Sequence, residues 1–315
     1  MVDEFEHVPV LVEEVMVGLN LQPDGAYVDA TYGRGGHSAE ILDRLGPNGR
    51  LLALDRDPQA IEAARARFAD DERFVAIPGR FSMLDQYIDK RGLTGRINGM
   101  LFDLGVSSPQ LEDPKRGFGF QQRGALDMRM EPDTGVSAAR WVNSAREQKI
   151  ASVLFEYGEE RFSRRIARAI VRERKQQPID TPAQLANIVS NAVPPRKAKL
   201  HPATRTFLAI RVFINQELEE LRTVLPQTMR ALAAGGRLAV ISFQSLEDRI
   251  VKRFMREQVR GGELPPGLPL LVQPFESRLK IIGKPIRPSA AEIERNPRAR
   301  SAMLRIAERT EVGFE

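Results

Sequence analysis

Short runs rich in β-formers alternate with helical stretches between residues 26 and 103, and this rhythm constrains the fold more than any other feature of the chain. The expected strands are Ala26–Ala30, Arg50–Asp55, Arg73–Ile77 and Ile97–Asp103, and the expected helices are Ser38–Leu45, Pro58–Phe68 and Met83–Lys90. Strands that alternate with helices pair in parallel, with the helices crossing over the sheet. The sequence therefore predicts an α/β fold with a mostly parallel sheet.

The rhythm stops after Asp103 and returns only towards the C-terminus. Residues 111–203 begin with a basic, glycine-rich loop and contain no convincing strand. A long helix is expected from Pro202 to Leu232, and later strands are expected at Arg237–Phe243, Leu279–Ile282 and Ser301–Ile306. We therefore expect a discontinuous domain, residues 1–110 plus 204–315, interrupted by an inserted helical domain, residues 111–203.

Charge is divided unevenly along the chain. The net charge is +5, but residues 1–110 carry −7 and the remainder carries +12. A basic second part is typical of proteins that meet a polyanion, although a solubilising surface has the same signature. Two basic segments are candidate contacts: a helix expected at Glu159–Lys175, with Arg161, Arg164, Arg165, Arg168 and Arg172 around its apolar face, and the segment Arg196–Lys199.

The chain has no cysteine and only three histidines, His7, His37 and His201. Disulfides and thiolate metal sites are therefore excluded, and we expect no metal centre. The N-terminus is acidic and lacks an apolar signal core, and no apolar run has the length of a membrane span. We expect a soluble, cytoplasmic protein without a membrane partner.

A glycine-rich loop, Gly33–His37, lies between the first expected strand and the first expected helix. Glycine permits positive φ and lets a ligand approach the backbone closely, here at the start of a helix. Asp55 ends the next strand, about 20 residues on, where a carboxylate can accept both hydroxyls of an adenosine ribose. This arrangement predicts a nucleotide-type cofactor site.

The loop departs from the dinucleotide pattern Gly-x-Gly-x-x-Gly, because Ser38 stands at the third glycine position. Asp29, just upstream, would repel a pyrophosphate but could pair with the ammonium of S-adenosylmethionine, which has no phosphate. The alternative for Asp29 is a side chain that caps the turn. Phe81 could flank an adenine ring or pack in the core. Asp103 closes an apolar strand at the ligand crevice of the sheet, where a structural salt bridge is the alternative.

Seven segments together resemble the ribosomal RNA small subunit methyltransferase H family: Gly33–Ser38, Leu54–Pro58, Asp103–Leu111, Leu126–Met130, His201–Phe207, Ser242–Arg249 and Asn296–Ser301. They run nearly from end to end and keep the family's order. The resemblance implies a class I methyltransferase (Rossmann-like) fold with an inserted helical domain. It also implies S-adenosylmethionine-dependent N4-methylation of a cytidine in the decoding region of 16S ribosomal RNA, within the small ribosomal subunit. A homodimer is an assembly that the sequence leaves open.

The resemblance further implies the cofactor contacts, which are Gly35, Gly36, His37, Asp55, Phe81, Asp103 and Gln110. Asp103 is also the candidate catalytic residue, expected to hold the cytosine amine together with the loop Ser107–Gln110. The acceptor of the amine could be Asp103, a serine hydroxyl or a backbone carbonyl. One departure from the family pattern is Gln244, where similar proteins usually have histidine. Glutamine has a donor and an acceptor but does not titrate, which argues against a role as proton acceptor.

In the inserted domain, Phe118, Phe120 and Trp141 are candidates for base stacking beside arginines that neutralise phosphates. His201 could also touch RNA, although a lone histidine in a loop more often has no special role. The target cytidine would have to be unstacked. Three other functions fit parts of the pattern: a DNA amino-methyltransferase, a non-catalytic RNA-binding assembly factor, and a nicotinamide oxidoreductase. The intact cofactor loop disfavours the second, and the missing third glycine disfavours the last.

Overall fold

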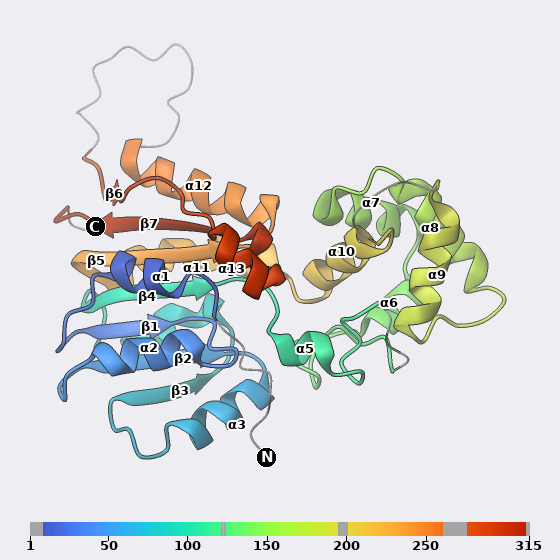
Figure 1. Ribbon diagram of the computed structural model, residues 1–315. Helices are drawn as coiled ribbons and strands as arrows, with labels where there is room; N and C mark the ends of the chain where they lie inside the picture. Colours follow the sequence, from blue (N-terminus) through green and yellow to red (C-terminus); the bar gives the residue numbers. More distant parts are fainter. Residues whose placement is uncertain (1–8, 121, 123, 195–200, 261–275, 313–315) are drawn as a thin grey trace, which may run out of the picture. The chain divides into compact units, whose positions relative to one another are not determined.

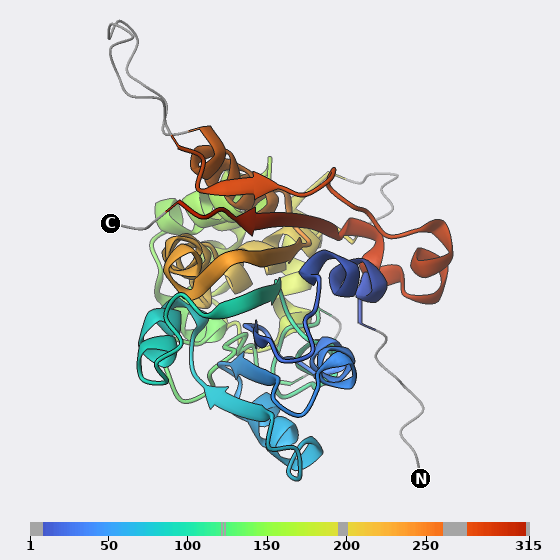
Figure 2. The same cartoon turned by 90° about the vertical axis from the view of Figure 1, so that its left-hand side faces the viewer.

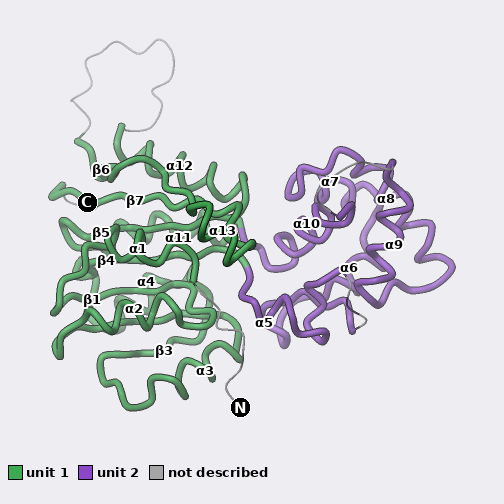
Figure 3. Tube along the Cα trace, viewed as in Figure 1, with its two compact units in different colours: residues 1–105, 218–315 green, residues 106–217 purple. Residues whose placement is uncertain are grey.

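The computed structural model describes residues 9–120, 122, 124–194, 201–260 and 276–312 (Figure 1). The chain divides into two compact units (Figure 3). Unit 1 is Met1–Gly105 with Leu218–Glu315, and unit 2 is Val106–Glu217. In the described ranges, no helix combines the length and apolar character needed to cross a bilayer. The expected RNA contact Arg196–Lys199, together with Pro195 and residues 1–8, lies outside the described residues.

Unit 1 is built on a seven-stranded sheet with the strand order β3-β2-β1-β4-β5-β7-β6. The strands are β1 (Ala26–Asp29), β2 (Arg50–Asp55), β3 (Phe74–Pro78), β4 (Ile97–Asp103), β5 (Leu232–Ser242), β6 (Leu279–Ile281) and β7 (Met303–Arg309). Strands β1 to β5 are parallel, and β7 runs antiparallel to both of its neighbours. The expected α/β fold class, with a mostly parallel, Rossmann-like sheet, is confirmed.

Helices cover both faces of this sheet (Figure 2). They are α1 (Val12–Leu19), α2 (Gly36–Arg44), α3 (Pro58–Arg67), α4 (Leu84–Asp89), α11 (Glu217–Ala231), α12 (Ser245–Arg260) and α13 (Ala290–Arg295), with 3-10 turns η1 (Phe81–Met83) and η2 (Pro297–Ser301). Successive side chains of a strand point to opposite faces. Leu52 and Leu54 accordingly pack with residues of α4, α11 and α12, whereas Leu51 packs with residues of α1 and α2.

The strand order reverses beside β1. From β1 the chain proceeds to β2 and β3 on one side and then crosses to β4 on the other. In parallel sheets, the ligand crevice lies outside the carboxyl ends of the strands at such a switch point. Since β1 ends at Asp29 and β4 ends at Asp103, both carboxylates lie at this edge of unit 1.

Unit 2 contains helices and no strand in the part that the structure describes. The helices are α5 (Ser108–Glu112), α6 (Ala138–Ser144), α7 (Glu147–Gly158), α8 (Ser163–Glu173), α9 (Pro182–Ala192) and α10 (Thr204–Ile214). They enclose a separate core, in which Trp141 packs against Phe213 with ring centroids 4.9 Å apart. The unit extends beyond the expected residues 111–203, because Phe207 and Ile210 of α10 belong to this core.

The long helix expected from Pro202 to Leu232 is wrong, because α10 ends at Ile214 and α11 begins at Glu217. Gln216 between them has a positive φ of 53°. The buried Asn215 directs its side chain to another loop of unit 2: its Oδ1 accepts from the Met130 N–H at 2.8 Å, and its Nδ2 donates to the Met128 carbonyl at 2.7 Å. The helix expected from Glu159 likewise begins only at Ser163, since Glu159 ends α7 with φ at 48°.

Replacing Asn215 with alanine should destabilise unit 2. The change leaves the buried Met130 N–H and Met128 carbonyl without these partners, and we expect the free energy of unfolding to fall by about 2–4 kcal/mol. Urea unfolding can be followed by the fluorescence of Trp141, the only tryptophan, which lies in the core of unit 2. Gln148→Ala, at an exposed position on α7, is the control. An unchanged unfolding midpoint for Asn215→Ala would contradict this role.

Candidate active site

The glycine loop leaves β1 and opens α2. Gly33 and Gly35 have positive φ values of 56° and 71°, a conformation that other residues rarely adopt. A Cβ at Gly35 would also lie 2.4 Å from the Tyr32 hydroxyl. Gly36 and His37 then form the first turn of α2. The sequence therefore provides bare backbone at a helix start, where N–H groups can meet polar groups of a ligand.

Asp55, at the end of β2, is tied to the glycine loop. Its Oδ2 accepts from the Gly33 N–H and its Oδ1 accepts from the Asp57 N–H, each at 2.8 Å. These bonds hold the carboxylate at the wall of a cavity of about 390 Å³, which is lined by Asp55, Arg56, Pro58, Ile61, Glu62, Arg65 and Pro78. Burial raises the pKa of Asp55 to about 6, although the two N–H donors act in the opposite direction.

Asp29, at the end of β1, is only 1% exposed. Its Oδ2 accepts from the Ser38 hydroxyl at 2.7 Å, and its Oδ1 accepts from the Thr31 N–H at 3.1 Å. Both oxygens thus serve the turn, which favours the turn-capping alternative over a direct contact with a ligand. The hydrogen bond from the Ser38 hydroxyl to Asp29 also gives a reason for serine, and not glycine, at the third glycine position of the loop. Burial raises the pKa of Asp29 to about 6.

Asp103, at the end of β4, contacts the loop through its backbone, since its N–H donates to the Thr31 hydroxyl at 2.6 Å. Its side chain is 23% exposed, and Oδ2 lies 3.7 Å from Nδ1 of His37. Oδ1 is buried and has no hydrogen-bond partner among the described residues. The Nε2 of His37 lies 2.9 Å from the Val10 carbonyl, which can only accept, so Nε2 carries a proton.

The carboxyl edge of the sheet is acidic. No lysine or arginine in the described part of the chain forms an ion pair with Asp29, Asp55 or Asp103. Burial raises the pKa of Asp103 to about 6, the charges of Asp29 and Glu247 act in the same direction, and His37 opposes them. Such an edge repels phosphate groups and complements a cationic ligand.

Phe81 and Gln110 complete the expected cofactor contacts. Phe81 opens η1 after β3 and packs edge-on against Phe102, with ring centroids 5.8 Å apart. It is half-buried and contacts the core, in line with the packing alternative. Gln110 lies in unit 2, where its Oε1 accepts from the Ser107 N–H at 3.0 Å in the capping box of α5. The structure thus brings six of the seven residues to one edge of unit 1 and places Gln110 in unit 2, and the cofactor contacts of all seven stay predictions.

Two of the three aromatic side chains expected to stack on RNA bases are buried. Phe118 and Trp141 are 6% and 8% exposed in the core of unit 2, and Phe120 stacks on His201 with centroids 4.5 Å apart. The expectation of base stacking is wrong for Phe118 and Trp141, because both side chains are buried in the hydrophobic core of unit 2. Within the described part of unit 2, an exposed aromatic residue is Phe155 of α7, which is 64% exposed and which the sequence pattern did not single out.

Glu247 is a further residue at the active-site edge that sequence reasoning missed. It is only 2% exposed, and its Oε2 accepts from the backbone N–H groups of Phe243 and Gln244 at 3.0 and 3.2 Å. It therefore holds the loop between β5 and α12. An acidic residue in the first turn of a helix is the one sequence signal that could have identified it.

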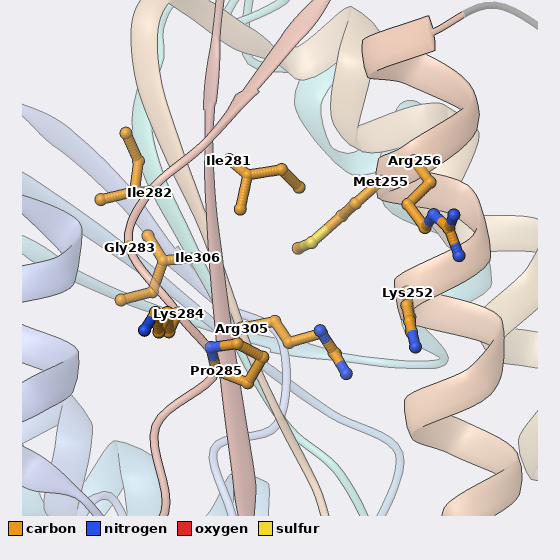
Figure 4. Close-up of a pocket in the computed structure, with 10 residues that line it drawn as sticks. All are labelled: Lys252, Met255, Arg256, Ile281, Ile282, Gly283, Lys284, Pro285, Arg305 and Ile306. Atoms are coloured by element: carbon orange, nitrogen blue, oxygen red, sulfur yellow. The ribbon is translucent and has the colours of Figure 1, made fainter.

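A second cavity, of about 180 Å³, lies between α12 and the strands β6 and β7 (Figure 4). Met255, Ile281 and Ile306 supply apolar surface, and Lys252 and Arg256 project from α12. None of the expected site residues lines it. This cavity therefore has the opposite charge to the β1–β4 edge and plays no part in the candidate active site.

The family model described as the MraW methylase family matches residues 4–310. The Ribosomal RNA small subunit methyltransferase H of Coxiella burnetii (strain Dugway 5J108-111) is 55% identical over 303 residues, which cover 96% of this chain and 98% of that protein. The protein of the same name from Thioalkalivibrio sulfidiphilus is 55% identical over 304 residues, which cover 96% and 97%. Among solved structures, an rRNA methylase from Streptococcus thermophilus aligns over 99% of both chains, with 13% identity and a TM-score of 0.42.

The resemblance found in the seven sequence segments is thereby confirmed. The family model spans nearly the whole chain, and relatives of matching length are more than half identical to it. This chain belongs to the MraW methylase family.

Proposed function

We propose that the protein transfers a methyl group from S-adenosylmethionine to N4 of a cytidine in the decoding region of 16S ribosomal RNA. The names of its relatives, which are small-subunit ribosomal RNA methyltransferases, support an RNA substrate of that class over DNA. The observation that supports this reaction is the acidic edge of unit 1, where three carboxylates adjoin a glycine loop and form no ion pair with a lysine or arginine of the described residues. Methylation of ribosomal RNA in the small subunit would require the protein to be in the cytoplasm.

The described residues fit this cofactor. S-adenosylmethionine carries an ammonium and a sulfonium, has no phosphate, and supplies its methyl group as an electrophile. Asp103 and the buried charge of Asp29 complement these cations, while Asp55 can accept hydrogen bonds from the ribose hydroxyls. Gly35, Gly36 and His37 would bind through the backbone at the start of α2. A pyrophosphate would be repelled by the same carboxylates, which disfavours a nicotinamide cofactor.

Positioning is the main task of the protein in this reaction. The exocyclic amine of cytosine is a weak nucleophile because its lone pair is delocalised into the ring. Orienting it and accepting its N–H bonds can lower the barrier by several kcal/mol. Asp103 Oδ1, buried and without a partner in the described residues, can accept one of these bonds. With a pKa of about 6, the Asp103 carboxylate can also take the proton that the amine loses after transfer and pass it to solvent.

Unit 2 would supply contacts to the RNA backbone. Arg164, Arg165 and Arg168 are exposed on α8, and within the described chain none of the three forms an ion pair. Their unpaired charges can neutralise phosphates, which releases counterions and makes binding depend on salt. The target cytidine has to leave its stack to meet the carboxylates.

The reaction can be tested with unmodified small ribosomal subunits and methyl-labelled S-adenosylmethionine. We expect labelled N4-methylcytidine in 16S RNA, identified by mass mapping of the nucleosides. Asp103→Asn keeps the size of the side chain but removes its charge, and should slow single-turnover transfer at saturating cofactor about a hundredfold. A label at another atom, or transfer to DNA alone, would contradict the proposed function. Transfer by Asp103→Asn at the wild-type rate would remove Asp103 from the chemistry.

Cofactor affinity should rise with pH. Burial places the pKa values of Asp29, Asp55 and Asp103 at about 6 in the free protein. A cationic ligand favours the ionised carboxylates, so binding releases protons and tightens from about pH 5 to about pH 7.5. Calorimetry in buffers of different ionisation enthalpy measures both effects. Asp55→Ala should weaken binding by about 1–3 kcal/mol. If affinity and proton release do not change with pH, the carboxylates do not face the cofactor.

Replacing Arg164, Arg165 and Arg168 with alanine should lower RNA affinity and flatten its dependence on salt. Cofactor affinity should not change, because α8 belongs to unit 2. A charge-matched control replaces Lys90, Arg91 and Arg96, three exposed cations of unit 1. Filter binding at several salt concentrations gives the slope for each variant. An α8 variant with the wild-type affinity and slope would place the RNA contact elsewhere.

A further inference from the structure

Two buried oxygen atoms at the active-site edge of unit 1 have no hydrogen-bond partner among the described residues. They are Oδ1 of Asp103, where β4 ends, and Oε1 of Gln244, in the loop after β5. Asp103 pairs with Ile241 in the sheet register, so the segments that carry both oxygens leave neighbouring strands at the same level. A buried acceptor without a donor costs about 1–3 kcal/mol. Two of them at one edge indicate a place where a ligand brings donors.

Glu247 determines which end of the Gln244 amide is presented. Its Oε1 accepts from Nε2 of Gln244 at 3.1 Å, while its Oε2 accepts from the backbone N–H groups of Phe243 and Gln244. An ionised carboxylate only accepts hydrogen bonds, so the NH₂ end of the amide has to face Glu247. The carbonyl oxygen of Gln244 is then the end left for a ligand.

The Gln244 loop also lies beside the loop that follows Asp103. A Cβ at Gly105, two residues after Asp103, would lie 3.9 Å from Cδ2 of Phe243, the residue before Gln244. Glu247 bonds directly to Gln244. The two unpartnered oxygens therefore lie on neighbouring segments that leave β4 and β5 at the same edge of the sheet.

We propose that Asp103 Oδ1 and Gln244 Oε1 together accept the two N–H bonds of the exocyclic amine of the substrate, so that Gln244 positions the substrate and determines its specificity. This inference rests on the proposed function, since it takes N4 of a cytidine as the methyl acceptor. A primary amine fits because it offers two donors to two acceptors. The carbonyl oxygen at C4 of uracil offers none and would set its lone pairs against both oxygens. The pair thus selects cytidine over uridine at the atom that is methylated.

The same two bonds prepare the nitrogen for transfer. The N–H bonds of the amine lie in the plane of the base, so acceptors in that plane leave the lone pair above the ring free. As that lone pair forms the bond to the methyl carbon, the bond from sulfur to carbon breaks and leaves its electron pair on sulfur. N4 gains positive charge, and both hydrogen bonds strengthen. One proton then passes from N4 to the Asp103 carboxylate and on to solvent, while the Gln244 amide remains neutral.

Gln244→Leu removes the acceptor and keeps much of the bulk. We expect single-turnover methylation of 16S RNA in unmodified small subunits, at saturating S-adenosylmethionine, to slow about 10- to 100-fold. The Kd for the cofactor, measured by calorimetry, should stay within about twofold of the wild-type value, because the lost bond is to the substrate. Thermal melting of the variant checks that it is folded.

Gln244→His is the matched variant that keeps the acceptor. A neutral ring can donate one N–H to Glu247 and present its other nitrogen, whereas a protonated ring has no acceptor. We expect near wild-type rates at alkaline pH, with the acidic limb of the rate profile moved to higher pH than in the wild type. A merely structural role for Gln244 would not move this limb.

Binding gives a readout that does not depend on turnover. With S-adenosylhomocysteine bound, the wild-type protein should bind small subunits with cytidine at the target position more tightly than subunits with uridine there, and Gln244→Leu should discriminate less. A folded Gln244→Leu variant with the wild-type rate and discrimination overturns the inference. So does a variant with weakened cofactor binding but an unchanged saturated rate, because its acceptor would then serve the ammonium of the cofactor. Failure of the wild type to form N4-methylcytidine would instead refute the proposed function.

Discussion

The Asp55 carboxylate accepts from the Gly33 N–H, the Ser38 hydroxyl donates to Asp29, and the Asp103 N–H donates to the Thr31 hydroxyl. Each of these bonds joins the segment Thr31–Ser38, which contains the glycine loop, to the end of a strand. The ends of the three neighbouring strands β2, β1 and β4 are therefore all hydrogen-bonded to this one segment. The bonds satisfy buried oxygens with neutral donors and leave the negative charge of the carboxylates uncompensated. The parallel sheet beneath supplies the rigidity, because its strands are buried on both faces. The electrostatic character of the edge therefore follows from backbone geometry.

Much of unit 1 could be predicted from the sequence, because side-chain periodicity and turn residues are local signals. The alternation between residues 26 and 103 predicts four strands, and the glycine loop and Asp55 follow from where those strands end. Asp103 could be placed for the same reason, since an acidic residue that closes an apolar strand has to lie at the sheet edge. The functional roles of these residues remain predictions.

The parts that could not be predicted depend on contacts between residues distant in sequence. The pattern from Pro202 to Leu232 continues as a helix, and only the bonds of Asn215 to residues 128 and 130 explain the break after Ile214. The sequence around an aromatic residue in a basic segment does not indicate whether a core will bury it, so the burial of Trp141 could not be predicted. The role of Glu247 could not be predicted for the same reason, because its hydrogen-bond partners are backbone N–H groups whose positions depend on the folded sheet.

The number of unpartnered acceptors beside the substrate has a consequence for how many times one base is modified. Under the proposed function, unmethylated cytosine would bring two N–H bonds, one for Asp103 Oδ1 and one for Gln244 Oε1. The neutral monomethyl product retains only one, so one buried oxygen loses its donor and the product is held less firmly than the substrate. A second transfer would start from this poorer fit and end with no N–H bond at all. In the proposed arrangement, the number of N–H bonds therefore favours release of the base after one methyl transfer and disfavours a second transfer to the same nitrogen.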